Sequence, residues 1–490
     1  MQRLAVFFFL LIWLDIRAQN LIFPQRNYQI HQFEKAIVTT DSIVHTSIQP
    51  QTTFLSGVDR NDLESLLHLK QRKTWIGRKL FSENLIQQKH EDLFLTIDPL
   101  YNLQLGRDEF TGENLFQNTR GVIVNGEINK KLQFFTTFYE NQGVFPAYLS
   151  NFIQINNVFP GNGRVKNFGP TGYDFAMASG MISFNAFDWL NIQFGNHKNF
   201  IGNGYRSLLL SDNSFNYPHL KLIAKSKNNK WVYQSIYASL INLQRLLATT
   251  SSEPQFQRKA ATFHYLSFKP NSKFSVGLFE GIIWQRRNDE GSIPFNWNFV
   301  NPIWGFNSAF TGFDRHQTNN TLGLNFTCSP VKPVELYGQA LFAELDLDKI
   351  GWQAGFKYFD AFTLKNFTIQ GEININEGMN YQIEKNQYLS YFHYNQPLGF
   401  TVEEFGAELL GVIKYNFKGV YVNAINSYSP SRNFFMNELG YRFNKFTGLG
   451  IGVFYARRMR VEDSFGYLFG SSNWMGIKIS TNINNYYLDF

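Results

Sequence analysis

From residue 92 to residue 490, apolar and polar side chains alternate with a period of two in one segment after another. The clearest example runs from Asn366 to Ile375, where apolar residues and one glycine occupy every second position and threonine, glutamine, glutamate and asparagine separate them. Because successive side chains of a strand point to opposite faces, each segment would have one apolar and one polar face. A membrane β-barrel has such strands, with lipid outside and water inside, and so does a soluble β-sandwich.

The lengths of the connections favour the barrel. Outer-membrane barrels have short turns at the periplasmic rim and long loops at the other rim. Tight polar turns are predicted at 129–130, 185–188, 228–229, 270–272, 331–333, 417–418 and 444–445, and long connections at 143–172, 286–317 and 375–403. The alternating segments start near residues 92, 120, 131, 173, 188, 219, 230, 258, 273, 318, 333, 352, 366, 404, 419, 436, 447 and 473. We therefore predict an all-β fold, a transmembrane antiparallel β-barrel of about 18 strands over residues 91–490, located in the outer membrane.

The aromatic content agrees with this prediction. Aromatic residues make up 17% of the chain, and 51 of them are phenylalanine. After the first residues, no apolar stretch approaches the roughly 20 residues that a helix needs to cross a bilayer. A barrel accommodates many rings in short segments, because its lipid-facing wall is bounded by aromatic girdles.

The N-terminal residues predict export and a separate helical segment. Residues 1–18 have a basic start, an apolar run from Leu4 to Leu14 and a small residue, Ala18, at the predicted cleavage site, which is typical of a signal peptide. Residues 19–90 are predicted to be a small helical segment on the periplasmic side that plugs or closes the mouth of the barrel. A loosely ordered leader is the alternative. Apolar residues have helical spacing at 61–71 and at 74–87, with Asp62 and Thr74 as candidate caps.

The C-terminal residues predict a final strand. Tyr486, Leu488 and Phe490 lie two positions apart and would share one face of it. An aromatic residue at this place resembles the terminal signal that the barrel-assembly machinery reads.

The densest group of functional side chains lies between Phe194 and Lys221, at the end of a predicted strand. Two glycines permit tight backbone conformations, an arginine offers a planar fork for carboxylates or phosphates, and a tyrosine offers a face for stacking. Such a mixture suits sugar or acidic polymer, and the alternative is a structural loop held inside the barrel by salt bridges. The candidate ligand-binding residues of this stretch are His197, Lys198, Gly202, Gly204, Tyr205, Arg206 and Asp212.

Three further candidates, Glu140, Gln142 and Glu280, lie in or at the end of predicted strands. We expect them to point into the lumen, where they would contact ligand or stabilise a polar interior.

Several kinds of chemistry are not supported by the motifs. The Gly202–Gly204 pair has no strand-turn-helix unit around it, so it does not predict a nucleotide site. Ser207 and Ser211 are not framed by a nucleophile elbow. The histidines lack metal-ligand spacing, and the single cysteine, Cys328, can complete neither a disulfide nor a thiolate metal site. We therefore predict no enzyme activity, no cofactor and no metal.

The chain resembles the Wzi-type capsule-assembly family, and in particular its longer RemB-like members from gliding bacteria. The resemblance implies an outer-membrane barrel of eighteen strands, periplasmic N-terminal helices and a surface role in holding or organising exported polysaccharide. Residues 377–380 and 396–400 depart from the pattern of the relatives. The stretches that carry the resemblance are 45–47, 97–99, 118–121, 139–142, 160–161, 279–280, 301–302, 337–339 and above all His197 to Asp212.

These observations lead to one functional prediction and two alternatives. The first is a non-enzymatic outer-membrane barrel that binds or organises capsular polysaccharide. The alternatives are a scaffold associated with gliding motility or secretion, with motility or secretion proteins as partners, and a diffusion porin. The formal charge is +7, and it becomes +6 when residues 1–18 leave with Arg3, Arg17 and Asp15. A mildly basic surface suits acidic polysaccharide or lipopolysaccharide, while an exported chain does not suit nucleic acid.

Overall fold

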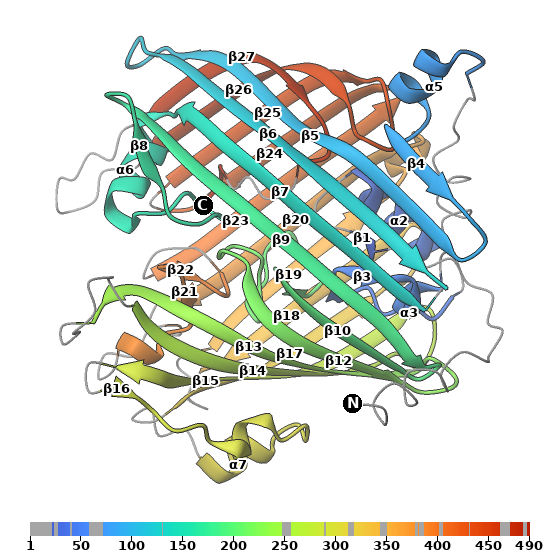
Figure 1. The fold of residues 1–490 in the computed structure, drawn as a ribbon, viewed down its shortest axis with the longest axis vertical. Helices are drawn as coiled ribbons and strands as arrows, with labels where there is room; N and C mark the ends of the chain where they lie inside the picture. The colour runs from blue at the N-terminus through green and yellow to red at the C-terminus, as the bar shows by residue number, and fades with distance from the viewer. Residues whose placement is uncertain are drawn as a thin grey trace, which may run out of the picture.

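A closed antiparallel barrel forms most of the computed structural model, which describes residues 22–23, 28–39, 42–57, 72–129, 131–246, 256–288, 291–311, 318–343, 350–377, 381, 387–400, 405–430, 432–460, 471–483 and 488–490. Eighteen long strands are found in these ranges, and the barrel closes where β27 pairs with β5 (Figure 1). The strands are β5 (Leu93–Asp108), β6 (Asn114–Ile128), β7 (Leu132–Val144), β9 (Gly172–Phe187), β10 (Leu190–His197), β12 (Tyr217–Lys225), β13 (Trp231–Arg245), β14 (Phe256–Phe268), β15 (Phe274–Asn288), β17 (Thr318–Cys328), β18 (Val334–Phe342), β19 (Ile350–Tyr358), β20 (Phe367–Glu377), β23 (Phe405–Phe417), β24 (Val420–Tyr428), β25 (Arg432–Arg442), β26 (Gly450–Arg460) and β27 (Ser472–Ser480).

The predicted strand number is confirmed, and so are most of the predicted strand starts. All but two of them lie within three residues of an observed start. The exceptions are β6, expected near 120 and beginning at Asn114, and β25, expected near 436 and beginning at Arg432. In both strands the missed residues include an apolar side chain that points inward, Leu115 or Phe434, so the contrast between an apolar outside and a polar inside disappears there.

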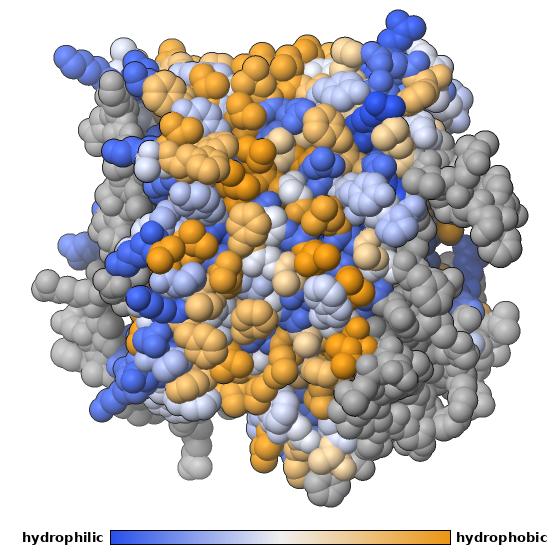
Figure 2. All heavy atoms as spheres, turned by 180° about the vertical axis from the view of Figure 1, so that it is seen from behind, coloured by the Kyte–Doolittle hydropathy of each residue, from blue (hydrophilic) through white to orange (hydrophobic). Residues whose placement is uncertain are grey.

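The wall has the predicted two faces. Along β27, Met475, Ile477 and Ile479 are exposed outside, whereas Trp474 is buried inside. Figure 2 shows apolar side chains over much of the outer wall. A surface of this kind suits hydrocarbon.

The two ends of the barrel differ as predicted. At the turn end, on the right in Figure 1, tight connections such as 129–131 and 226–230 join the strands, and the left-handed conformations of Asn129 and Asn229 (φ 51° and 54°) fit tight turns. At the loop end, the connections carry α6 (Ala147–Asn156), β8 (Lys166–Phe168), β16 (Gly291–Ser292), η1 (Trp297–Val300), α7 (Phe306–Thr311), η5 (Gln387–Leu389), β21 (Phe392–His393) and β22 (Gln396–Pro397).

Residues 28–39 and 42–57 occupy the turn end of the lumen. The elements here are α2 (Tyr28–Thr39), β2 (Ile48–Gln49), β3 (Gln51–Thr52) and α3 (Thr53–Ser56), and β3 pairs with β1 (Ile22–Phe23). Lys357 bonds Glu34 of α2 at 3.1 Å, and Lys35 bonds Asp360 of the β19–β20 turn at 2.7 Å. The helix that enters the barrel is therefore α2, whereas the sequence showed helical spacing only at 61–71 and 74–87.

The predicted helix at 74–87 forms only in part and does not fill the mouth. It is α5 (Trp75–Phe81), and Thr74 caps it as expected by accepting a hydrogen bond from Gly77 N at 3.1 Å. Residues after it form β4 (Ile86–Lys89), which pairs with β5. Trp75 is 64% exposed, so the expectation that this helix plugs the lumen was wrong. The other predicted helix, residues 61–71 with its Asp62 cap, and the signal peptide at 1–18 lie outside the described residues.

The chain end turns back into the lumen instead of forming a strand. The last strand is β27, and Phe490 packs against Phe152 of α6 with ring centroids 4.4 Å apart. The hydroxyl of Tyr148 donates to Leu488 O at 2.8 Å. The prediction of a terminal strand through Leu488 and Phe490 was therefore wrong, because these residues lie inside the barrel against α6 and Arg458 of β26 and do not extend the sheet. Tyr486 is outside the described ranges.

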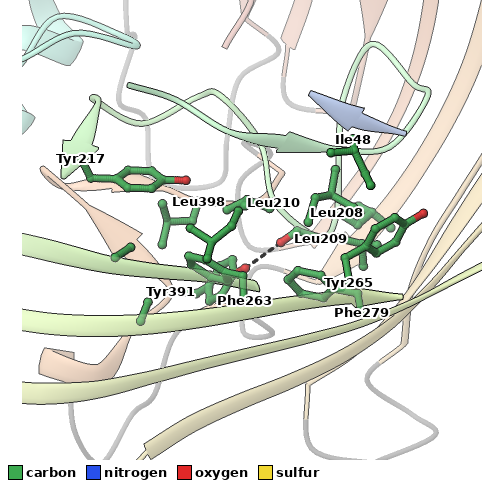
Figure 3. Packing of buried hydrophobic residues seen from close by; sticks show 14 of the residues in the cluster. Ile48, Leu208, Leu209, Leu210, Tyr217, Phe263, Tyr265, Phe279, Tyr391 and Leu398 are labelled. Atoms are coloured by element: carbon green, nitrogen blue, oxygen red, sulfur yellow. Dashed lines mark hydrogen bonds between the residues drawn. The ribbon is translucent and has the colours of Figure 1, made fainter. Parts of the chain in front are cut away.

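The lumen also contains a hydrophobic core. In Figure 3, Leu208, Leu209 and Leu210 of the β10–β12 connection lie close to the wall residues Phe263 and Phe279. Tyr391 donates from its hydroxyl to Leu209 O at 2.8 Å. All three leucines are fully buried, which stabilises the inserted connection by about 2 kcal/mol for each side chain. In the ranges given above, no helix has the length and apolar character to span a membrane.

Candidate functional site

The connection between β10 and β12, residues 198–216, runs through the lumen. Its short strand β11 (Phe200–Ile201) pairs with β2 of the N-terminal segment. Gly202 has φ +142°, and a Cβ added there would lie 2.3 Å from the side-chain nitrogen of Gln339. A Cβ on Gly204 would lie 2.6 Å from a carboxylate oxygen of Glu372. Glycine is therefore required at both positions for the backbone to lie against the wall.

Arg206 lies at the centre of a buried ionic network. Its Nε and Nη2 donate to the two carboxylate oxygens of Glu408 at 3.1 and 2.9 Å, and Nη2 also lies 3.0 Å from Asp489 Oδ2. Glu372 accepts from the backbone amides of Tyr205 and Arg206 at 2.6 and 3.0 Å. Burial alone lowers the pKa of the Arg206 guanidinium, but Asp489 and Glu408 together outweigh this effect and hold it well above its ordinary value. Arg206 is thus a permanent cation.

His197 and Lys198 also contact other groups inside the barrel. The Lys198 ammonium donates to Gly161 O at 2.6 Å and to Asp212 O at 2.8 Å. His197 lies with Nδ1 2.6 Å from Lys198 O and Nε2 2.9 Å from the sulfur of Met181. These contacts support the structural reading of His197, Lys198 and Arg206, in which they hold the connection in place.

Tyr205, Gly204 and Asp212 instead line a cavity of about 370 Å³ inside the barrel. Its other walls come from α2, β2 and β11, from the strands β5, β19, β20, β23–β25 and β27, and from the C-terminal residues. The lining includes Glu34, Gln49, Asn102, Gln104, Phe200, Lys357, Gln370, Lys414, Asn416, Tyr421, Asn423, Glu438, Arg442, Lys478, Asn482 and Asp489.

An ion pair and an arginine–tyrosine contact give this cavity its chemistry. Lys478 bonds Glu438 at 2.6 Å. The Arg442 guanidinium lies 4.7 Å above the ring centre of Tyr421 and donates to Asn416 Oδ1 at 3.3 Å. Amides and charged groups gathered in one cavity can bind sugar hydroxyls and carboxylates.

Glu140 and Gln142 do not point into the lumen. On β7 it is Tyr139 and Asn141 that are buried inside, and Asn141 accepts from Thr119 at 2.6 Å. Glu140 is exposed on the outer wall opposite Arg120, and Gln142 lies on the same outer face, 3.5 Å from Asp174. The expectation that Glu140 and Gln142 face the lumen was wrong. A shift of one position along a strand moves a side chain to the opposite face of the wall.

Glu280 is buried, but on the outside of the wall. Phe279 and Ile283 of β15 belong to the lumenal core, so Glu280 between them points outward. Its carboxylate accepts from the amides of Gly305 at 2.8 Å and Ser308 at 3.1 Å. The prediction that Glu280 faces the lumen was therefore also wrong.

The cavity residues of β23–β27 were missed by the sequence reasoning. Lys414, Glu438, Arg442 and Lys478 are charged residues within strands whose alternate positions are apolar. A charged residue in a strand whose alternate positions are apolar is expected to face inward. This signal could have identified the four residues from the sequence. In the described ranges, no group of three or more His, Cys, Asp and Glu side chains is arranged to hold a metal ion.

No protein-family model matches this chain, and no curated protein matches it. Among solved structures, it is similar to Wzi of Escherichia coli, an outer-membrane protein described as involved in group 1 capsule assembly and as a carbohydrate-binding β-barrel. The TM-score is 0.57 at 12% identity, over 95% of this chain and 100% of that one. OccAB2 of Acinetobacter baumannii gives a TM-score of 0.43 at 10% identity, over 79% of this chain and 97% of that one. The outer membrane protein OpdK of Pseudomonas aeruginosa gives 0.43 at 10% identity, over 80% and 98%. The fold is thus Wzi-like, and the protein is an outer-membrane barrel.

Proposed function

We propose that this barrel binds exported surface polysaccharide, of capsular type, without chemical conversion, and that the lumenal cavity is where it binds. The observation that carries the proposal is the lining of this cavity. Lys414, Arg442 and Lys478 lie there with side-chain amides and the Tyr421 ring. The likeness to a carbohydrate-binding barrel supports it as well. The family assignment, including its RemB-like branch, is part of this proposal.

The cationic side chains of the cavity would hold an acidic sugar. Lys478 and Lys357 each have a carboxylate partner at 2.6 or 3.1 Å, and Arg442 donates to the side-chain amide oxygen of Asn416 at 3.3 Å. A guanidinium presents its N–H groups in one plane, where two of them can bind a carboxylate side by side. The carboxylate of a uronic acid residue would meet these donors.

Binding is tested on the full-length protein in detergent by titration calorimetry. The probe is a short oligogalacturonate, and a malto-oligosaccharide of equal length is the neutral control. Saturable binding of the acidic probe, weakened by salt, is the expected result. No binding of either sugar, or equal binding of both, would contradict the proposal.

A chromosomal deletion separates this function from the two alternatives. Loss of capsule with intact surface spreading is expected if the barrel holds polysaccharide. Loss of spreading with intact capsule would support the motility or secretion scaffold, and reduced uptake of small solutes would support a porin.

A further inference from the structure

Residues 291–311, here called the outer segment, lie on the outside of the barrel although they belong to a loop-end connection. Phe299 of the segment stacks on Trp284 of β15 with ring centroids 4.0 Å apart. Trp284 has the outward orientation of Glu280, while their neighbour Ile283 is in the lumenal core. In Figure 1, α7 lies beside β15 outside the wall, about midway between the two ends of the barrel.

The wall beneath the outer segment is unusually polar for this depth. Tyr233 and Tyr237 of β13, Thr262 of β14 and Glu280 of β15 all point outward here. Glu280 is six positions from the start of β15 at the turn end. With a rise of ~3.3 Å per residue and a tilt of about 45°, it lies roughly 14 Å above the turn-end rim, within the span of an apolar band ~25 Å tall.

Each of these polar groups bonds the backbone of the outer segment. Thr262 donates to Phe299 O at 2.6 Å, Tyr237 donates to Val300 O at 3.1 Å, and Tyr233 donates to Pro302 O. Glu280 accepts from two amides of the segment, as described above. Wall and segment therefore satisfy several of each other's hydrogen-bonding groups.

The opposite side of the outer segment exposes large apolar side chains, with Asn296 and Asn298 on either side of Trp297. Trp297 is 76% exposed, and Ile303 is 59% exposed. The exposed Leu324 and Phe326 of β17 continue this apolar surface along the wall. Irregular backbone is tolerated at membrane depth only where protein covers its polar groups, and that is the arrangement seen here.

We propose that the outer segment lies in the membrane, with its backbone turned to the wall and with Trp297 and Ile303 in contact with lipid acyl chains. The lipid-facing surface of this protein then includes a non-strand element, which covers the polar sector of β13–β15. This inference does not depend on the proposed sugar-binding function.

Spin labels on single cysteines test the position of the segment. In a Cys328→Ser background, Trp297→Cys and Ile303→Cys carry a nitroxide, and the protein is reconstituted in phosphatidylcholine vesicles. Ile477→Cys on the wall and Phe110→Cys in the β5–β6 loop are references, since these two side chains are similarly exposed (54% and 58%). We expect collisions with oxygen to exceed collisions with Ni-EDDA at positions 297 and 303, as at 477. A ratio like that at 110 would overturn the proposal, and so would dipolar broadening that shows a second copy on this face.

A second variant tests how the segment is fastened. Glu280→Ala removes the acceptor of two amides, and Ni-EDDA accessibility at position 297 should rise severalfold while the barrel stays folded. Glu140→Ala, an exposed carboxylate on the same outer wall, is the matched control. If Glu280→Ala does not assemble, Tyr237→Phe removes one hydroxyl and should give a smaller rise. Unchanged accessibility in a folded variant would contradict the fastening.

Discussion

Arg206 binds both carboxylate oxygens of Glu408, a residue 202 positions later in the chain. Both side chains are fully buried inside the barrel. The pair joins the inserted β10–β12 connection to the wall strand β23. Since Arg206 and Glu408 lie on different elements, the strength of this ion pair measures how firmly the β10–β12 connection is held to the wall.

Replacement of Arg206 by alanine should destabilise the folded protein by about 3–5 kcal/mol, because two buried carboxylates, Glu408 and Asp489, lose their cation. Thermal unfolding in detergent, followed by heat-modifiable gel mobility, measures the loss. The double variant Arg206→Gln/Glu408→Gln should lose less than the sum of the two single variants. Strict additivity would show that the pair is not coupled.

Acidification should loosen the N-terminal segment through His45. Its ring nitrogens lie 2.7 Å from Ser267 Oγ and 2.8 Å from Asn229 O, and burial lowers its pKa to about 4 from 6.5. Between these values the released histidine binds a proton and the docked one does not. The stability of docking is therefore complete above pH 6.5 and is lost as the pH falls toward 4, by up to about 3 kcal/mol.

Hydrogen exchange of residues 42–57, at pH 7.5 and pH 4.5 and corrected for intrinsic rates, measures this effect. His45→Asn removes the titrating group and serves as control, with little pH dependence expected. Protection that is equal at both pH values in the unmodified protein would contradict the role of His45.

Arg442→Gln should weaken binding of an acidic oligosaccharide about tenfold, the value of one hydrogen bond to a charged group. Lys414→Gln should have a similar effect, since its side chain lines the same cavity. Arg457→Gln removes an equal charge from the exposed outer wall, and it should leave the affinity unchanged. Equal losses in all three variants would indicate a nonspecific effect of net charge.

The N-terminal segment should limit ion flow through the lumen. Glu34→Gln/Lys35→Gln removes the contacts of α2 with Lys357 and Asp360, and single-channel conductance in planar bilayers should rise or flicker relative to the unmodified protein. A large, steady conductance of the unmodified protein would instead indicate an open pore.

The alternation of side chains was sufficient to predict the wall, since lipid and water act on every strand in the same way. It failed where the environment changes, as at Leu115 and Phe434, which face an apolar interior built by the loops. The outward orientation of Glu280 was hidden for a related reason, because protein covers it on the lipid side. The residues of the β10–β12 connection were recognised as important. The two ion-pair partners of Arg206 were not, since Glu408 and Asp489 are distant in sequence and meet Arg206 only in the closed barrel.

This arrangement has a consequence for how the molecule comes together. The inserted connection ends at residue 216 of the sequence. The carboxylates that neutralise Arg206 come much later, from Glu408 in β23 and from Asp489 near the end of the chain. Until β23 and the C-terminal residues have joined the barrel, a desolvated Arg206 guanidinium would have no carboxylate beside it. Filling the inside and completing the ring are therefore one cooperative event, and neither half of this chain can reach its final form without the other.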